Sequence, residues 1–146
     1  MRILFPAIAV IASLVAAPAW AGDLTVKVTG IKAKGGSLIV AVYDQATLFR
    51  AQPPFFGTAK VTGTDDVTVT IKDVAAGDYV VSVLHDTNDD EKMTMGPTGR
   101  FAEGTALTNA EKLRGPPTFE VNKISIPATG ASLTLAMSYP EDRADW

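Results

Sequence analysis

One short segment gathers most of the side chains that could hold a ligand or take part in a reaction. It is His85–Lys92, with the sequence HDTNDDEK, and it contains the chain's single histidine. Asp86, Asn88 and Asp90 occupy alternate positions, the spacing of the first three side-chain ligands in a calcium-binding loop. The sequence therefore predicts a Ca²⁺ site with Asp86, Asn88 and Asp90 as ligands and His85 outside the coordination sphere.

The match to a calcium-binding loop is partial. The sixth position, usually Gly because the backbone turns sharply there, is Glu91, and the twelfth, usually a bidentate Glu, is Pro97. Glu103 is a further carboxylate downstream. The other interpretation is a solvated turn, because Asp and Asn favour turns by bonding to their own backbone. Any Ca²⁺ site in this segment is therefore expected to be weak.

Residues for catalysis are scarce. The chain has no Cys and one His, which excludes thiol nucleophiles, Cys-ligated zinc and metal sites built from several histidines. No GxSxG motif is present, and Ser37, Ser82, Ser125, Ser132 and Ser138 fall in predicted strands or directly beside one. The sequence therefore favours a non-enzymatic protein. The alternative is a small-molecule-binding protein or an enzyme with a pocket under residues 86–118, near His85, Arg100 and Glu103.

Composition narrows the classes of partner. The chain has 146 residues, of which 47% are apolar and 20% charged, which is enough apolar content for a packed core. The formal net charge is −3, so there is no basic excess to neutralise nucleic-acid phosphates. The absence of Cys also excludes disulfides and a lipid anchor on an N-terminal Cys. Nucleic acid is therefore not expected as a partner.

The N-terminus is typical of a secretory signal peptide. Arg2 precedes an apolar stretch over residues 3–17, and Ala19 and Ala21 stand at the −3 and −1 positions of a cut before Gly22. A membrane anchor is the weaker interpretation, because the stretch is shorter than the ~20 residues that span a bilayer. We expect residues 1–21 to be removed, Sec-type export to the periplasm or beyond, and one domain over residues 22–146 without a transmembrane segment.

The rest of the chain predicts β-structure. Alternating apolar residues and turn signals indicate seven short strands, and seven such strands are typical of an antiparallel sandwich. A transmembrane barrel is disfavoured, because its strands need about ten residues and aromatic girdles. The expected strands are 24–28, 37–43, 58–62, 67–72, 79–84, 119–126 with a bulge at 122–123, and 133–138.

No strand pattern spans the long segment 86–118. Loops of this length are usually functional or contain an unrecognised element. Thr108 and Glu111 have the spacing of a helix capping box, and Gly115 follows as a helix stop, so a short helix over 106–114 is one expectation. The segment is expected to cover one end of the sheets.

Several motifs, taken together, resemble those of DUF2141, a bacterial family of exported proteins. Residues 77–88, GDYVVSVLHDTN, are similar to its core "PGxYAVxVxHDxNxNGKxD", and residues 36–49 to its "GxLxVALYDxxxxF". The elements "GxP" and "GPPxF" match residues 96–97 and 115–119, and residues 133–139 also fit. Residues 90–92 depart from the pattern by lacking its Gly, and Thr94 replaces its Asp. Both differences weaken the Ca²⁺ prediction.

The resemblance implies a fold rather than an activity: an immunoglobulin-like or transthyretin-like sandwich. Together with the residue-level reasoning, it leads to one functional expectation. The chain is expected to be an exported, non-enzymatic binding or accessory module with a weak Ca²⁺ site in the 86–91 loop.

Overall fold

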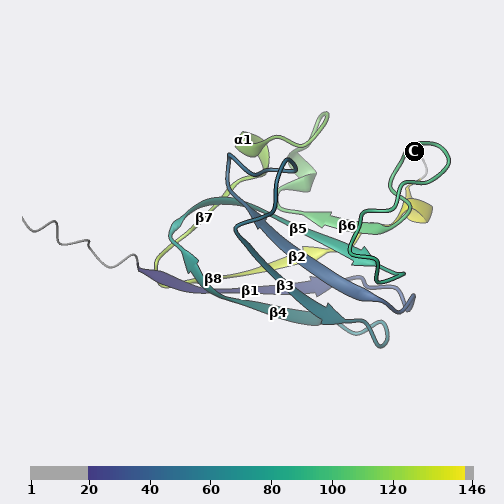
Figure 1. Ribbon diagram of the computed structural model, residues 1–146, viewed down its shortest axis with the longest axis horizontal. Coiled ribbons are helices and arrows are strands. Elements are labelled where there is room, and N and C mark those ends of the chain that lie inside the picture. The colour runs from purple at the N-terminus through teal and green to yellow at the C-terminus, as the bar shows by residue number, and fades with distance from the viewer. Residues whose placement is uncertain (1–19, 144–146) are drawn as a thin grey trace, which may run out of the picture.

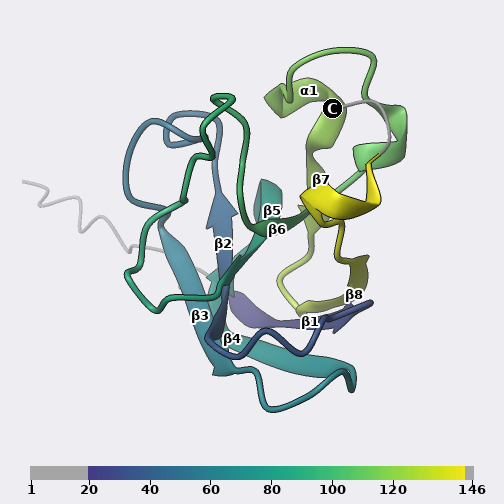
Figure 2. The ribbon, with the colours of Figure 1, turned by 90° about the vertical axis from the view of Figure 1, so that its right-hand side faces the viewer.

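The computed structural model describes residues 20–143, which form two β-sheets with short helical turns (Figures 1 and 2). The predicted signal peptide lies outside the described residues except for its last two. The strands are β1 (Ala21–Thr29), β2 (Ser37–Tyr43), β3 (Phe55–Lys60), β4 (Val67–Ala75), β5 (Gly77–Asp86), β6 (Gly104–Leu107), β7 (Ile124–Ile126) and β8 (Ala131–Ala136). The helical turns are η1 (Ala110–Lys112), α1 (Phe119–Asn122) and η2 (Pro140–Asp142).

The sheets confirm the expected all-β, sandwich-like architecture in outline. One sheet has the strand order β4-β1-β8, and the other has the order β3-β2-β5-β6 with β7 also paired to β5. Two details of the prediction are wrong. The described residues form eight strands rather than seven, and β1 pairs with β8 in parallel, whereas every other strand pair is antiparallel.

Period-2 alternation explains the core between the sheets. Leu24, Val26 and Val28 of β1 are fully buried, while Thr25 and Lys27 between them are not. β5 is apolar on both faces, and Val81 and Val83 are also buried. Burying each such side chain contributes about 1.5–3 kcal/mol, so these two strands anchor the sandwich.

The expected strand over 119–126 is instead the helical turn α1 followed by β7. The Thr118 side chain accepts a hydrogen bond from Val121 N at 3.3 Å, which caps the turn. Asn122 is fully buried, and its amide accepts from Thr118 N at 3.1 Å and donates to the Thr108 carbonyl at 2.7 Å. The apolar alternation predicted a strand because it contains no information about these three side-chain hydrogen bonds to the backbone.

The expected helix over 106–114 is also wrong. β6 occupies its first residues, and only the three-residue turn η1 is helical. The Thr108 hydroxyl does not cap a helix: it donates to the Asn122 carbonyl at 2.7 Å and accepts from Val81 N at 3.2 Å. β6 pairs with residues 82–85 of β5, so the long segment contains the eighth strand.

The sandwich is joined along one side at a single point. Thr105 of β6 and Ser138, two residues after β8, exchange two backbone hydrogen bonds of 2.9 Å. Beyond that pair β6 leads into η1, while β8 runs along β1 in the other sheet (Figure 2). We call the gap between them the seam. Within residues 20–143, no helix is long and apolar enough to cross a membrane.

Candidate functional site

Asp86, the first predicted calcium ligand, is buried at the end of β5. It is 1% exposed, and its two carboxylate oxygens accept backbone hydrogen bonds from Asp90 N at 3.2 Å and Glu91 N at 2.8 Å. Glu91 adopts φ 58°, a left-handed conformation that favours glycine. The carboxylate of Asp86 thus holds the loop that follows it.

Asn88 and Asp90, the other predicted ligands, lie at the exposed rim of this loop. The Asn88 amide donates to Asp90 Oδ2 at 3.0 Å, and Lys92 N donates to Asp90 Oδ1 at 2.9 Å. Among residues 20–143, no group of three or more His, Cys, Asp or Glu side chains is arranged to hold a metal ion. The Ca²⁺ site therefore stays a prediction.

Asp89, which the spacing argument passed over, ties the loop to the sheet. Its carboxylate accepts from Ser37 Oγ at 2.6 Å and pairs with Lys60 Nζ at 2.7 Å. The hydrogen bond from Lys60, supported by that from Ser37, lowers the pKa of Asp89 below its ordinary value. The three aspartates Asp86, Asp89 and Asp90 thus have separate partners.

Glu103 anchors the other end of the loop. It is 4% exposed, and it accepts from Thr87 N through Oε1 and from Thr94 N through Oε2, both at 3.0 Å. Asp86 and Glu103 are both buried, and both accept hydrogen bonds from backbone N–H groups of the same segment. Since a buried, unpaired N–H is costly, these carboxylates are a reason the irregular segment holds one conformation.

His85 is fully buried and has a partner on each ring nitrogen. Nε2 lies 2.7 Å from the Gly35 carbonyl, which can only accept, so Nε2 carries the proton of the neutral ring. Nδ1 then accepts from the Tyr139 hydroxyl at 2.7 Å. That hydroxyl in turn accepts from Lys32 N at 3.0 Å. Burial raises the pKa of Tyr139 above its ordinary value.

The turn before β2 can approach His85 closely because its residues 35 and 36 are both glycine. Gly36 has φ 71°, and a side chain there would lie 2.1 Å from the carbonyl oxygen of Asp86. Any other residue would push the turn away from β5 and break the contact between Gly35 and His85.

Arg100 lies apart from His85 and Glu103. It is exposed on the hairpin around Gly96–Arg100 and helps to line a hollow of about 260 Å³. His85 and Glu103 line neither this hollow nor the larger cavity described next. The structure therefore does not bring the three predicted pocket residues to one cavity.

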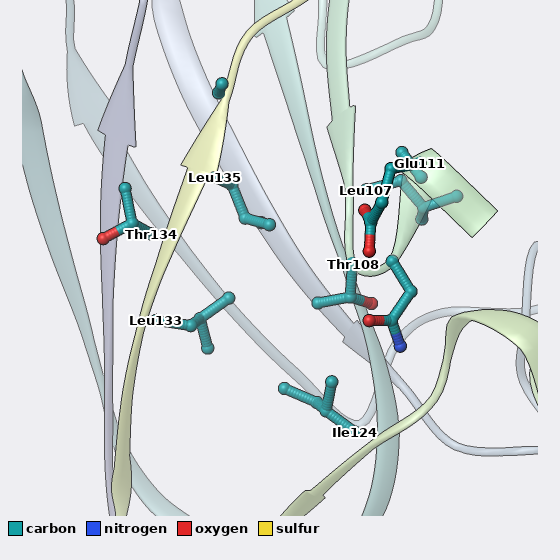
Figure 3. A pocket seen from close by; sticks show the side chains of 10 residues that line it. Leu107, Thr108, Glu111, Ile124, Leu133, Thr134 and Leu135 are labelled. Atoms are coloured by element: carbon teal, nitrogen blue, oxygen red, sulfur yellow. The ribbon is translucent and has the colours of Figure 1, made fainter.

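The larger cavity is a cleft of about 380 Å³ at the seam (Figure 3). Leu133 and Leu135 of β8 point into it from one side, across from Leu107 and Ile124. Its polar lining comes from Thr108, Asn109 and Glu111, and Ala110, Ala136 and the backbone of Thr134 complete it. We call this space the seam cleft.

A family model matches residues 26–134, described as "Uncharacterized protein conserved in bacteria (DUF2141)". The chain belongs to the DUF2141 family. Its resemblance motifs fall on β2, on β5 with its following loop, and on the segment before α1. No curated protein and no solved structure matches the chain. The match includes His85, Asp86 and Glu103 but ends before Tyr139, the partner of His85.

The seam cleft of this DUF2141 chain has no motif in the sequence. Leu133 and Leu135 read as core residues of the last strand, and Leu107 falls in the segment where no strand was expected. In the structure, the burial of successive residues alternates along Gly104–Leu107. In the sequence, a segment of four residues is too short to distinguish a strand from a loop.

Proposed function

We propose that the protein is an exported, non-enzymatic binding module whose ligand site is the seam cleft. The observation that carries this proposal is an open cleft of about 380 Å³ lined by four large aliphatic side chains. Ligand sites are typically concave, mostly apolar and at least ~300 Å³ in volume, with a few polar groups that orient the ligand. Export is supported by the signal-peptide pattern of residues 1–21.

The contacts of the polar residues favour binding over catalysis. Both nitrogens of His85 are engaged, and the oxygens of Glu103 accept backbone N–H groups. A general acid or base must instead reach a substrate proton. A pocket near His85, Arg100 and Glu103 is therefore the weaker alternative. The immunoglobulin-like or transthyretin-like relationship rests on the two facing sheets and the family motifs.

The Ca²⁺ proposal for Asp86, Asn88 and Asp90 is a separate one. Its support is the alternate spacing of three oxygen side chains. Against it, the oxygens of Asp86 and Asp90 already accept hydrogen bonds from the loop itself. A cation would have to share these oxygens, so only weak binding is expected.

The seam-cleft proposal can be tested with an apolar fluorophore, N-phenyl-1-naphthylamine, titrated into the exported protein. We expect saturable enhancement of fluorescence at one site. Leu133→Glu should abolish it, because the side chain at 133 points into the cleft, as Figure 3 shows. The matched control is Thr134→Glu, whose side chain points away from the cleft and is exposed.

Melting curves of both variants establish that they are folded. Absent enhancement in the wild type, or equal loss of enhancement in the two folded variants, would contradict a ligand site at the seam.

A further inference from the structure

β8 leaves one of its two edges without a partner strand. Along Ala131–Ala136 it pairs only with β1 among the described strands. Met137 N donates to the Thr29 carbonyl at 2.9 Å, so odd-numbered residues turn their backbone groups toward β1. Because successive residues of a strand alternate, Ser132, Thr134 and Ala136 turn theirs to the opposite edge. Among residues 20–143, the backbone N–H and C=O groups along that edge have no partner strand.

The free edge faces the seam cleft. Thr134 lines the cleft although its side chain points away from it, as Figure 3 shows, so its backbone forms part of the wall. Leu133 and Leu135, between the edge-facing residues, point their side chains into the cleft. Hydrogen-bonding groups and an apolar pocket therefore lie together along one strand.

The chain itself shows how a strand pairs with this edge. Ser138, the next residue of the same parity, exchanges two backbone hydrogen bonds with Thr105 of β6. β6 then pairs with β5 only, and its last residue, Leu107, lines the cleft. The edge over 132–136 continues the same row of groups, with the cleft where a paired strand would run.

The charge at the cleft indicates the chemistry of its ligand. Glu111 is the only charged residue that lines the cleft, and it is exposed. Among the described residues its backbone carbonyl accepts from Arg114, but its carboxylate has no ion pair or hydrogen bond. An unpaired carboxylate beside an apolar pocket favours a ligand that carries a basic group.

We propose that the seam cleft binds an extended peptide of a partner protein, which adds to β8 as a strand. The peptide pairs its backbone with Ser132, Thr134 and Ala136, places alternate apolar side chains among Leu107, Ile124, Leu133 and Leu135, and sets a Lys or Arg near Glu111. Strand addition is an established mode of peptide recognition, in which main-chain bonds give affinity and pockets give specificity. About five residues, or roughly 16 Å of extended chain, match the free edge. This inference rests on the proposed function.

The first test uses a display library of random heptapeptides selected on the exported protein. We expect enrichment of sequences with apolar residues at alternate positions and one basic residue. In the best synthetic peptide, backbone N-methylation at edge-facing positions should weaken binding about tenfold, the value of one hydrogen bond. N-methylation at the intervening positions should change it less than about threefold. Binding without this alternation would overturn strand addition.

The second test acts on the protein. Thr134→Pro removes the edge-facing N–H and should weaken the same peptide about tenfold or more. The control is Thr70→Ala, on the exposed face of β4 and outside the cleft, which should leave the affinity unchanged. Should the Pro variant fail to fold, amide exchange in the wild type replaces it: the peptide should slow exchange at 132, 134 and 136 but not at 133 and 135.

The remaining outcomes also decide. No enriched peptide would refute the peptide ligand, while fluorophore binding would leave the seam cleft standing as a site for small apolar molecules. Concentration-dependent dimerisation that protects 132, 134 and 136 would assign the edge to a second copy of the chain and overturn the proposal. If the wild-type protein bound neither a peptide nor the fluorophore, the proposed function would be overturned as well.

Discussion

The buried hydrogen bonds of Tyr139 make Tyr139→Phe a sensitive test of the His85 site. The tyrosine is 1% exposed, and its hydroxyl donates to His85 Nδ1 at 2.7 Å and accepts from Lys32 N at 3.0 Å. Phe keeps the ring, which packs edge-on to His85 with centroids 5.8 Å apart, and removes only the hydroxyl. The change leaves His85 Nδ1 without its donor and Lys32 N without its acceptor, at a cost of about 1–3 kcal/mol.

The magnitude is large relative to the stability of the protein. A small domain has about 5–15 kcal/mol in total, and a domain of this size loses roughly 4 °C in melting temperature for each kcal/mol. We therefore expect Tyr139→Phe to melt about 4–12 °C below the wild type.

The assay is thermal unfolding followed by circular dichroism. The matched control is Tyr43→Phe, because the Tyr43 hydroxyl is half-buried and has no hydrogen bond to a described residue, although its ring lies 5.4 Å from that of Phe49. That variant should melt within about 2 °C of the wild type. Equal melting of Tyr139→Phe and the wild type would refute the argument that this hydroxyl holds His85.

Three further predictions follow from the core, the C-terminal ion pairs and the acidic loop. Val83→Asp places a carboxylate at a position that is 1% exposed and should cost several kcal/mol of stability. Circular dichroism should then show a largely unfolded protein. The control Thr70→Asp, on the exposed face of β4, should change the stability by less than about 1 kcal/mol. The hydrogen bond from Lys34 lowers the pKa of Glu141 to about 2, so its contribution is complete above about pH 4.5 and is lost as the pH falls toward 2. Since the Glu141 side chain is 43% exposed, the loss should be about 0.5–1 kcal/mol, and Glu141→Gln should reduce the acid-induced drop in stability by that amount. If the acidic loop binds Ca²⁺ with a dissociation constant of about 0.1 mM, 10 mM Ca²⁺ should raise the free energy of unfolding by about 2.7 kcal/mol relative to EDTA. An equal melting temperature of the wild type in Ca²⁺ and in EDTA would contradict a Ca²⁺ site.

Asp86→Ala separates the two roles of the acidic loop. It should destabilise the protein even in EDTA, because Asp90 N and Glu91 N lose their acceptor. It should also abolish any rise with Ca²⁺. Asn88→Ala is the matched control. Among residues 20–143 the Asn88 side chain bonds only to the exposed Asp90, so this variant should leave the melting temperature in EDTA almost unchanged.

Strands with strict alternation could be predicted from the sequence because their burial repeats every two residues. β1 and most of β4 follow this rule. β5 was predicted from its nearly continuous apolar run instead, because it is buried on both faces. The last strand was also found, but its parallel pairing with β1 was not. Direction of pairing depends on where the chain returns, which local periodicity does not encode.

The elements that were missed depend on contacts distant in the sequence. β6 has four residues and is a strand because residues 82–85 of β5 offer it an edge. α1 replaces a predicted strand because Thr118 and Asn122 bond to the backbone of the turn and of Thr108. Side-chain hydrogen bonds of this kind override an apolar pattern, and only the folded arrangement reveals them.

The candidate site also depends on contacts between residues that are distant in the sequence. His85, Asp86 and Glu103 drew attention because their types suit catalysis or metal binding. In the structure their polar atoms bond to backbone groups, except His85 Nδ1, which bonds to the Tyr139 hydroxyl. A polar motif after a buried strand therefore marks, in this DUF2141 chain, the anchoring of the long loop. The cleft that could admit a ligand is lined by residues of β6, β7, β8 and the turn after β6. It exists because, among residues 20–143, Thr105 and Ser138 are the one backbone pair that joins β6 to the segment following β8. Topology, rather than a sequence motif, creates the opening on which the proposed function depends.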